Sequence, residues 1–375
     1  MPPRRKTRGR DFTGGALPYL SQHRGSTGDA AIDERVRALV ADWDGKPRPE
    51  LIEELIITAL KSGHDSATVG DLKLMNRSLR EMRDAARCFN SYASRRKVVV
   101  FGSARTPYDG PESRAAEAFA TKMVAEGYMI ITGAGDGIMG AAQKGAGREA
   151  SFGLNIKLPF EQGANETIGG DRKLVTFNYF FTRKLSFVKE AEAFALFPGG
   201  FGTMDELFEV LTLIQTGKAA VLPVVMVDIP GGRYWDVWLE FVRAQLLTRG
   251  LISPDDLSLF RITDNINEAV EEITRFYRVF RSHRYMGGEF VFRLNTPLSA
   301  AKLTLLNRDF RDLLVEGDFR LGEALPGEAN EPELESMQRL IFKARRQRFG
   351  RIRELIDEVN RADASDSLPD VENAT

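Results

Sequence analysis

From residue 97 onward the chain alternates short apolar runs with amphipathic stretches, and this alternation restricts the fold more than any other feature. The runs predicted as strands are residues 97–101, 128–132, 152–157, 173–177, 193–197 and 223–228, with a last sheet-like run at 257–262. The stretches predicted as helices are residues 112–126, 137–149, 179–191, 203–216, 234–247 and 265–280. Strands that are apolar throughout are typical of parallel sheets covered on both faces. Because strand-helix-strand crossovers are right-handed, the series predicts an α/β fold with a Rossmann-like doubly wound parallel sheet.

The chain on either side of this series lacks the alternation and is predicted to form extensions. The predicted division is a mobile basic tail at residues 1–30, a helical N-terminal extension at 31–94, the Rossmann-like domain at 95–285 and a mostly helical C-terminal extension at 286–375. Apolar residues at helical spacing predict two N-terminal helices between residues 33 and 60, broken at 45–49, and a third over 69–89. The C-terminal extension is predicted to contain a short strand at 289–294, a helix at 298–314, a linker at 326–332 and a long basic helix at 333–361.

Charge and cysteine content exclude several classes of function. The 52 Lys and Arg residues balance 53 Asp and Glu residues, so no global field attracts nucleic acid or an anionic membrane. Cys88 is the single cysteine, which excludes intrachain disulfides and Cys-based zinc sites. His23, His64 and His283 lie far apart in the sequence, without the spacing of metal ligands. The sequence therefore predicts neither a metal site nor a cofactor.

Hydropathy indicates a soluble protein. Hydrophobic residues make up 43% of the chain and charged residues 28%, as in ordinary globular proteins. The basic N-terminus is not followed by the apolar run of a signal peptide, and no segment approaches about 18 consecutive apolar residues. The chain is therefore predicted to be cytoplasmic and not membrane-bound.

Three of the predicted strand-to-helix turns are rich in glycine, and ligands of open α/β sheets bind at such turns. They are residues 101–105, 132–140 and 197–206. The second contains Gly135-Asp-Gly137-Ile-Met-Gly140, a formal match to the dinucleotide fingerprint. However, the next predicted strand ends in Lys157 and offers no acidic residue for a ribose. The hypothesis that the chain is an NAD-dependent oxidoreductase rests on this match alone.

The third turn is more specific for a ligand. Gly199, Gly200 and Gly202 let a ligand approach the backbone closely, and Thr203 opens a helix whose free N–H groups attract an anion. Glu206 follows about one turn into that helix, so a single loop could hold a phosphate beside a carboxylate. The alternative interpretation is a tight turn followed by a favourable first-turn acid.

Arg183 and Lys184 stand near the start of the helix predicted at 179–191. Cations there oppose the helix dipole, which favours them at the other end. Their position is easier to explain if they meet an anionic ligand or Glu206, although two surface charges are the alternative.

The string Pro198-Gly-Gly-Phe-Gly-Thr-Met-Asp-Glu206 is similar to the PGGxGTxxE signature of the Lonely Guy (LOG) family, often labelled lysine decarboxylase-like. The Gly-Ser turn at 102–103, the TGAGDGIMGAAQKGA segment and the upstream Arg-Lys pair also occur in the family's order. The resemblance covers about residues 95–280, and the extensions resemble those of the longer members. It implies a phosphoribohydrolase that cleaves a nucleoside 5′-monophosphate, a cytokinin ribotide or AMP, into free base and ribose 5-phosphate.

The resemblance also implies roles for individual residues. Arg183 matches the family's catalytic arginine, and Glu206 is the expected carboxylate beside the anomeric carbon, where positive charge develops as the base leaves. The expected substrate-binding residues are Gly102, Ser103, Gly133, Gly135, Lys184, Gly199, Gly200, Gly202 and Thr203. No lysine is distinguished as the Schiff-base residue that the decarboxylase label would require.

The family resemblance implies a homodimer whose subunits complete each other's sites. The apolar stripes of the N- and C-terminal helices favour further assembly, up to a hexamer. The alternative function is a nucleotide-binding or sensing protein without turnover, which would need the loop but not Glu206 and Arg183.

Overall fold

The computed structural model describes residues 25–43, 48–65, 67–159, 163–328, 331–345 and 348–361. Most of the predicted mobile tail lies outside these residues, and Ala30 already begins a helix. The described residues divide into two compact units, one up to Asp84 and the other from Ala85 onward.

The first unit is helical, as predicted. It consists of α1 (Ala30–Asp42), α2 (Pro49–His64) and most of α3 (Val69–Asn90). Asp29 caps α1 by accepting hydrogen bonds from the backbone N–H groups of the first turn, and α2 begins at a proline, which lacks the donor that a first turn leaves unpaired. The last turn of α3 belongs to the second unit, where Phe89 stacks on Phe152 at 4.4 Å between ring centroids.

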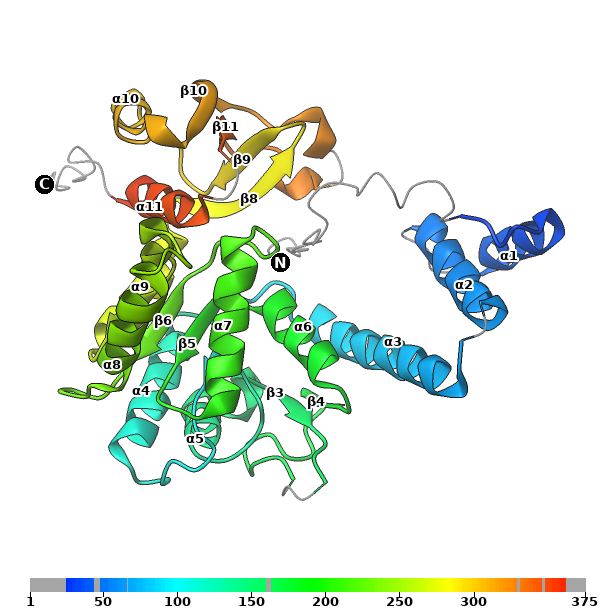
Figure 1. The fold of residues 1–375 in the computed structure, drawn as a ribbon, viewed down its shortest axis with the longest axis horizontal. Helices are drawn as coiled ribbons and strands as arrows, with labels where there is room; N and C mark the ends of the chain where they lie inside the picture. Colours follow the sequence, from blue (N-terminus) through cyan, green and yellow to red (C-terminus); the bar gives the residue numbers. More distant parts are fainter. Residues whose placement is uncertain are drawn as a thin grey trace, which may run out of the picture. The chain divides into compact units, whose positions relative to one another are not determined.

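A seven-stranded parallel sheet organises the second unit (Figure 1). Its strands are β1 (Lys97–Phe101), β2 (Met129–Thr132), β3 (Ser151–Ile156), β4 (Leu174–Phe177), β5 (Ala193–Leu196), β6 (Val224–Val227) and β7 (Arg261–Thr263). Their order in the sheet is β4-β3-β2-β1-β5-β6-β7, and all neighbouring strands are parallel. The chain therefore moves outward from β1 in one direction and returns to place β5 on its other side. This topology confirms the Rossmann-like doubly wound fold.

Helices cover both faces of the sheet. They are α4 (Pro111–Ala125), α5 (Ile138–Ala146), α6 (Phe180–Glu190), α7 (Phe201–Gln215), α8 (Tyr234–Phe241) and α9 (Ile266–Phe276). Val98 and Val100 of β1 pack in the apolar core that includes α4, α5 and α9. Val99 and Phe101 point to the opposite face and pack in the core that includes α6, α7 and α8. This alternation along one strand explains why β1 is apolar throughout.

Two elements of this domain differ from the prediction. The first half of the sheet-like run predicted at 257–262 belongs to a 3₁₀ helix (Pro254–Leu259), and only its last two residues belong to β7. Pro254 and the capping box of Ser253 and Asp256 favour that helical turn. The helix predicted over 234–247 is α-helical as far as Phe241 and continues as a π-helical turn to Leu247.

The C-terminal extension differs more strongly, because a second sheet replaces much of the predicted helix. This antiparallel sheet contains β8 (Phe280–Met286), β9 (Glu289–Leu294), β10 (Leu314–Gly322) and β11 (Arg339–Ala344), in the order β10-β11-β9-β8. The strand predicted at 289–294 is β9, and the helix predicted at 298–314 is the shorter α10 (Ala300–Asp309). The prediction of one long helix at 333–361 is wrong: residues 339–344 form β11, and α11 (Phe349–Asn360) begins only after it.

Burial explains why the basic pattern at 333–361 was misleading. Arg339 in β11 is fully buried and donates a hydrogen bond from Nε to Glu328 at 3.1 Å. Arg353 in α11 is also buried, with Nη2 3.1 Å from Asp357 and a closer contact to Glu272. Two charges that suggest a solvated helical face are therefore paired inside the domain. The apolar face of α11 is covered by the same unit, so it offers no surface for assembly.

No helix among the described residues combines the length and apolar character needed to cross a membrane.

Candidate functional site

The first and third glycine-rich turns lie side by side at the point where the strand order reverses. They follow β1 and β5, which are neighbours in the sheet. The backbone N–H of Ser103 donates to the carbonyl of Pro198 at 3.1 Å, and that of Phe197 donates to Phe101 at 2.8 Å. Ligands of open α/β sheets bind at such a reversal. The topology thus brings together two turns that lie far apart in the sequence.

The second turn, after β2, joins the same place. The backbone N–H of Ile138 donates to the carbonyl of Ser103 at 3.1 Å. Gly137 has a φ of +59°, and a Cβ there would lie 2.3 Å from the Ser103 carbonyl oxygen. A Cβ on Gly102 would lie 2.5 Å from the Ile138 side chain. Only glycine fits these contacts, so the glycines of the first two turns allow the turns to touch.

Asn165 fixes the second turn and was not found from the sequence. Its side-chain amide donates to the carbonyls of Ala134 at 3.1 Å and Gly135 at 2.9 Å, and to Gln143 at 2.6 Å. Ala134 has a φ of +65°, a left-handed conformation that is uncommon for residues other than glycine. No sequence pattern around Asn165 indicates this contact, because it comes from the connection between β3 and β4.

The third turn combines one crowded glycine with two open ones. A Cβ on Gly199 would lie 2.1 Å from the Thr203 hydroxyl and 3.0 Å from the Ser103 nitrogen. Equivalent atoms on Gly200 and Gly202 would meet nothing within 4 Å. The chain thus needs Gly199 for packing, while Gly200 and Gly202 leave open space at the first turn of α7, which we call the anion cradle. The exposed backbone there suits an anion.

Tyr234 at the start of α8 supports this turn, and sequence reasoning missed it. Its hydroxyl donates a short hydrogen bond to the carbonyl of Gly199. Asp228, at the end of β6, accepts a hydrogen bond from the Tyr234 backbone N–H at 2.9 Å and so holds the start of α8. The third turn is therefore supported by the connection that follows the neighbouring strand β6.

Glu206 lies one turn into α7 and is only 5% exposed. Within the described part of the chain its Oε2 accepts no hydrogen bond. Burial raises the pKa of Glu206 to about 7, although the nearby charges of Lys184 and Arg183 lower it. A carboxyl group with a pKa near neutrality can take up and release a proton under physiological conditions.

Lys184 of α6 lies among acidic residues of α7. Its Nζ is 2.5 Å from Glu209, 2.9 Å from Asp205 and 3.7 Å from Glu206. Burial alone would lower the pKa of Lys184, but hydrogen bonds to Glu209 and Asp205 outweigh it and raise that pKa. Lys184 therefore stays protonated and links α6 to α7 beside Glu206.

Arg183 faces the second turn. A Cβ on Gly133 would lie 3.1 Å from its Nη2, and its Cζ lies 5.3 Å from the centroid of the Phe187 ring. Its charge is close enough to lower the pKa of Glu206. The structure thus brings the two residues expected to be catalytic to the same end of the sheet as all three turns. Among the residues that the structure describes, no three His, Cys, Asp or Glu side chains are arranged to hold a metal ion.

Comparison with known families gives a match in this domain. The family model described as "Possible lysine decarboxylase" matches residues 139–273, which include Arg183 and the whole third turn. A probable cytokinin riboside 5′-monophosphate phosphoribohydrolase of Oryza sativa subsp. japonica is 32% identical over 164 residues, 42% of this chain. The matched region spans 63% of that rice protein. A cytokinin riboside 5′-monophosphate phosphoribohydrolase of Arabidopsis thaliana is 25% identical over 185 residues, covering 48% of this chain and 83% of the relative.

Solved structures with some likeness include the molybdenum cofactor carrier protein of Chlamydomonas reinhardtii and the molybdenum cofactor binding protein of Rippkaea orientalis. Each is 17% identical and covers 48% of this chain, with TM-scores of 0.35 and 0.34 and coverage of 97% and 93% of the solved chains.

The family model and the plant relatives coincide with the region that carries the signature. They confirm the resemblance that the signature indicated: the Rossmann-like domain of this chain is similar to members of the Lonely Guy family of lysine decarboxylase-like proteins.

Proposed function

We propose that this chain is a nucleoside 5′-monophosphate phosphoribohydrolase, which hydrolyses the N-glycosidic bond of cytokinin ribotides, of AMP or of both. The observation that carries the proposal is Glu206, a buried carboxyl group with a pKa near 7 placed beside an open anion cradle. The plant relatives named for this reaction support it.

In the proposed reaction the 5′-phosphate binds the backbone N–H groups at Gly200 and Gly202 and the Thr203 hydroxyl. This placement leaves the ribose near Glu206, one helical turn further along. As the bond from C1′ to the base nitrogen breaks, its electron pair leaves with the base and positive charge develops on the sugar. The ionised Glu206 stabilises that charge and accepts a proton from the water that attacks C1′, while the base takes up a proton from solvent.

The other expected residues either contact the nucleotide or position Glu206. We propose that Arg183 binds the ribose or the phosphate, because it faces Gly133 across the site. Gly102, Ser103 and Gly135 would form the floor below the nucleotide. Lys184, expected from the sequence to bind the same anion, is engaged by three carboxylates and is better assigned to positioning Glu206.

The family description suggests a decarboxylase, which would use pyridoxal phosphate bound to a lysine amine. The site does not fit that chemistry. A Schiff base needs an uncharged amine, whereas Lys184 is held as an ammonium by Asp205 and Glu209. A nucleotide sensor without turnover remains the second candidate, but it gives no reason to bury an ionisable carboxyl group beside the cradle.

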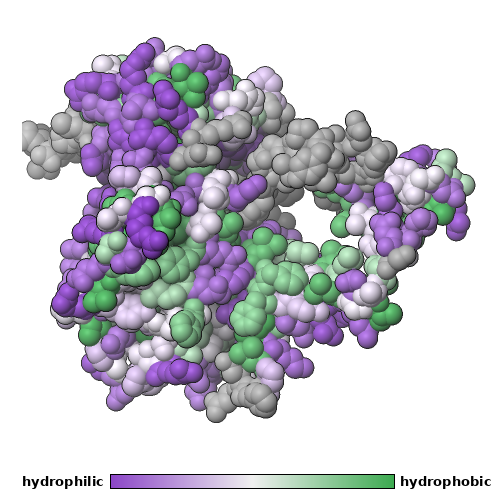
Figure 2. Space-filling model, in the orientation of Figure 1, coloured by the Kyte–Doolittle hydropathy of each residue, from purple (hydrophilic) through white to green (hydrophobic). Residues whose placement is uncertain are grey.

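We also propose that the chain forms a homodimer through the surface next to this site. The large apolar side chains exposed there are Phe180, Phe181 and Leu185 of α6, Phe201 and Phe208 of α7, and Val237 and Phe241 of α8. Figure 2 shows apolar surface over α6 and α7, interrupted by a polar strip. Phe201, beside the cradle, is 96% exposed, which is costly for a side chain of its size unless a second subunit covers it. Exposed leucines of α2 and α3, such as Leu51 and Leu72, favour assembly beyond a dimer.

The direct test incubates the purified chain with AMP and with isopentenyladenosine 5′-monophosphate and follows free base and ribose 5-phosphate by chromatography. The wild type should release both products in equal amounts, and Glu206→Gln should lose most of the activity. Glu316→Gln, an exposed substitution on β10 away from both the site and the proposed dimer surface, serves as the matched control and should behave as wild type. Binding of both nucleotides without cleavage would favour the sensor.

A further inference from the structure

A pocket of about 340 Å³ lies at the end of the parallel sheet where the strands begin, opposite the glycine-rich turns. Its walls come from the residues just before β1, β2 and β5, together with Arg281 of β8 and Asn295 after β9. Because the strands are parallel, all of them begin at one end of the sheet and finish at the other. The pocket is therefore separate from the site of the proposed hydrolysis and shares no residue with it.

Positive charge dominates this pocket. Arg95, Arg96 and Arg281 line it, against the carboxylates of Glu126 and Glu192. A fourth cation lies next to the lining: Lys97 is 3% exposed and its ammonium donates to the carbonyl of Arg95 at 2.9 Å. The three guanidinium groups and two carboxylates of the lining leave a surplus of one positive charge around a concave surface, and Lys97 lies behind it. Such a surplus attracts an anion.

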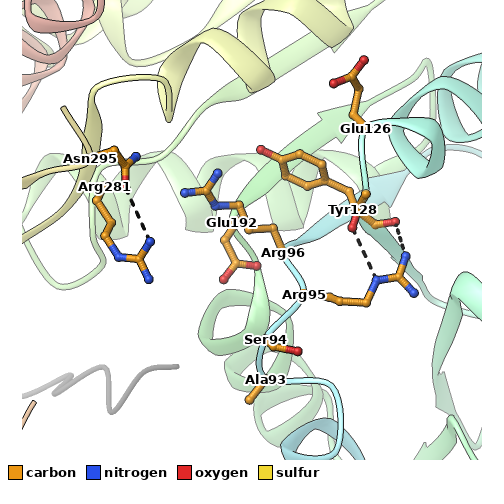
Figure 3. Close-up of a pocket in the computed structure, with 10 residues that line it drawn as sticks. Ala93, Ser94, Arg95, Arg96, Glu126, Tyr128, Glu192, Arg281 and Asn295 are labelled. Carbon is orange, nitrogen blue, oxygen red and sulfur yellow. Dashed lines mark hydrogen bonds between the residues drawn. The ribbon is translucent and has the colours of Figure 1, made fainter. Parts of the chain in front are cut away.

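Arg96 is held in an orientation that suits anion binding. Its Cζ lies 4.1 Å from the centroid of the Tyr277 ring, and the Tyr277 hydroxyl donates to the carbonyl of Glu192 at 2.6 Å. Stacking uses the flat face of a guanidinium and leaves the N–H donors at its edge for an acceptor. Figure 3 shows Arg96 in the middle of the pocket, between Tyr128 on one side and Arg281 with Asn295 on the other.

The other two guanidinium groups are held at the sides of the pocket. Arg95 donates to the carbonyls of Gly127 at 3.4 Å and Tyr128 at 3.1 Å, which uses two of its five N–H donors. Arg281 donates to the Asn295 side chain at 3.5 Å, so the second sheet contributes its own cation (Figure 3). Side chains that are already held lose little freedom when a ligand binds, which favours affinity.

We propose that this pocket is a second binding site, distinct from the hydrolytic site, for a phosphate group. The group belongs either to free phosphate or to a small phosphate monoester such as a sugar phosphate or nucleotide. The volume is at the lower end of the range of small-molecule sites, which suits ligands of this size. Planar guanidinium groups are the preferred partners of phosphate oxygens in proteins.

The test separates this pocket from the cradle by using Gly202→Asp as the starting protein. A carboxylate there repels phosphate from α7, and a Cβ on Gly202 meets nothing within 4 Å. Inorganic phosphate is titrated calorimetrically into this variant at low ionic strength, then ribose 5-phosphate and AMP. Arg96→Gln and Arg281→Gln are each added to it, with the exposed Arg233→Gln as the control. Thermal unfolding checks that each protein is folded.

We expect saturable phosphate binding to Gly202→Asp that weakens about tenfold or more with Arg96→Gln or Arg281→Gln, because each removes a charged hydrogen bond. Arg233→Gln should leave it unchanged. Tighter binding of ribose 5-phosphate or AMP would identify a monoester as the ligand, and equal binding would identify free phosphate. Absence of saturable binding to Gly202→Asp, or binding that both pocket substitutions leave intact, would overturn the proposal. Since no turnover is measured, failure of the proposed hydrolysis would not affect the result.

Discussion

Replacing Lys184 by methionine should change the pH dependence of the proposed reaction. Lys184 Nζ lies 3.7 Å from Glu206 Oε2 and favours the ionised carboxylate. At an effective dielectric constant of about 20, two charges at this separation interact by about 4 kcal/mol, an upper bound equivalent to about three pH units. Methionine keeps most of the apolar part of the side chain but removes this attraction.

The same substitution exposes Glu206 to two further carboxylates. Asp205 and Glu209 share the Lys184 ammonium, and both raise the pKa of Glu206. Removing the lysine therefore raises that pKa by lost attraction and by repulsion that is no longer compensated. Solvent screens Asp205, whose side chain is 60% exposed, so we expect the acid limb of the profile to move to higher pH by about one unit or more, not the full upper bound.

The assay measures kcat/KM for the nucleotide that is cleaved, over about five pH units centred on neutrality. With Glu206 as the base, the wild-type rate should rise through a pKa of about 7 and then level off. Lys184→Arg keeps the charge and should keep this inflection. Lys189→Met, on the exposed side of the same helix, should also keep it. An unchanged inflection in Lys184→Met, with activity lowered equally at every pH, would refute the reasoning and reduce Lys184 to a structural contact.

Three further outcomes follow from the same geometry. Folding raises the pKa of Glu206 from 4.5 to about 7, so the folded state binds the proton more tightly than the unfolded state, and the free energy of unfolding of the wild type should fall as pH rises over this interval. Urea unfolding should show that the free energy of unfolding of Glu206→Gln increases by up to about 3 kcal/mol relative to wild type across the same interval. Gly199→Ala places a Cβ against the Thr203 hydroxyl and should raise KM for the nucleotide about tenfold, measured by initial rates against the wild type. Tyr234→Phe loses the hydrogen bond to the Gly199 carbonyl and should weaken nucleotide binding about two- to tenfold in calorimetry; an unchanged affinity would show that α8 does not support the cradle.

Much of the parallel sheet could be predicted because its signals are local. Runs such as 97–101 and 193–197 are apolar at every position, and each is followed by an amphipathic helix, so the pattern repeats and limits the topology. The second sheet has no such repetition. Its strand β11 contains Arg339, and the partner that makes this charge acceptable inside the domain, Glu328, lies in a short 3₁₀ helix outside the strand. A buried ion pair of this kind has no local signature, so the basic stretch has the same pattern as the exposed side of a helix.

The same distinction between local and long-range signals applies to the residues of the candidate site. Gly199, Thr203 and Glu206 stand within one continuous string, because an anion cradle and the acid that follows it need consecutive residues at the start of a helix. Asn165 holds the second turn and Tyr234 holds the third, each from another connection of the sheet, and only the fold reveals these contacts. The groups that would meet the substrate could therefore be found from the sequence, whereas the groups that fix their geometry required the fold. If catalysis depends on that geometry, substitutions at such supporting positions should affect rate and affinity although they touch no substrate atom.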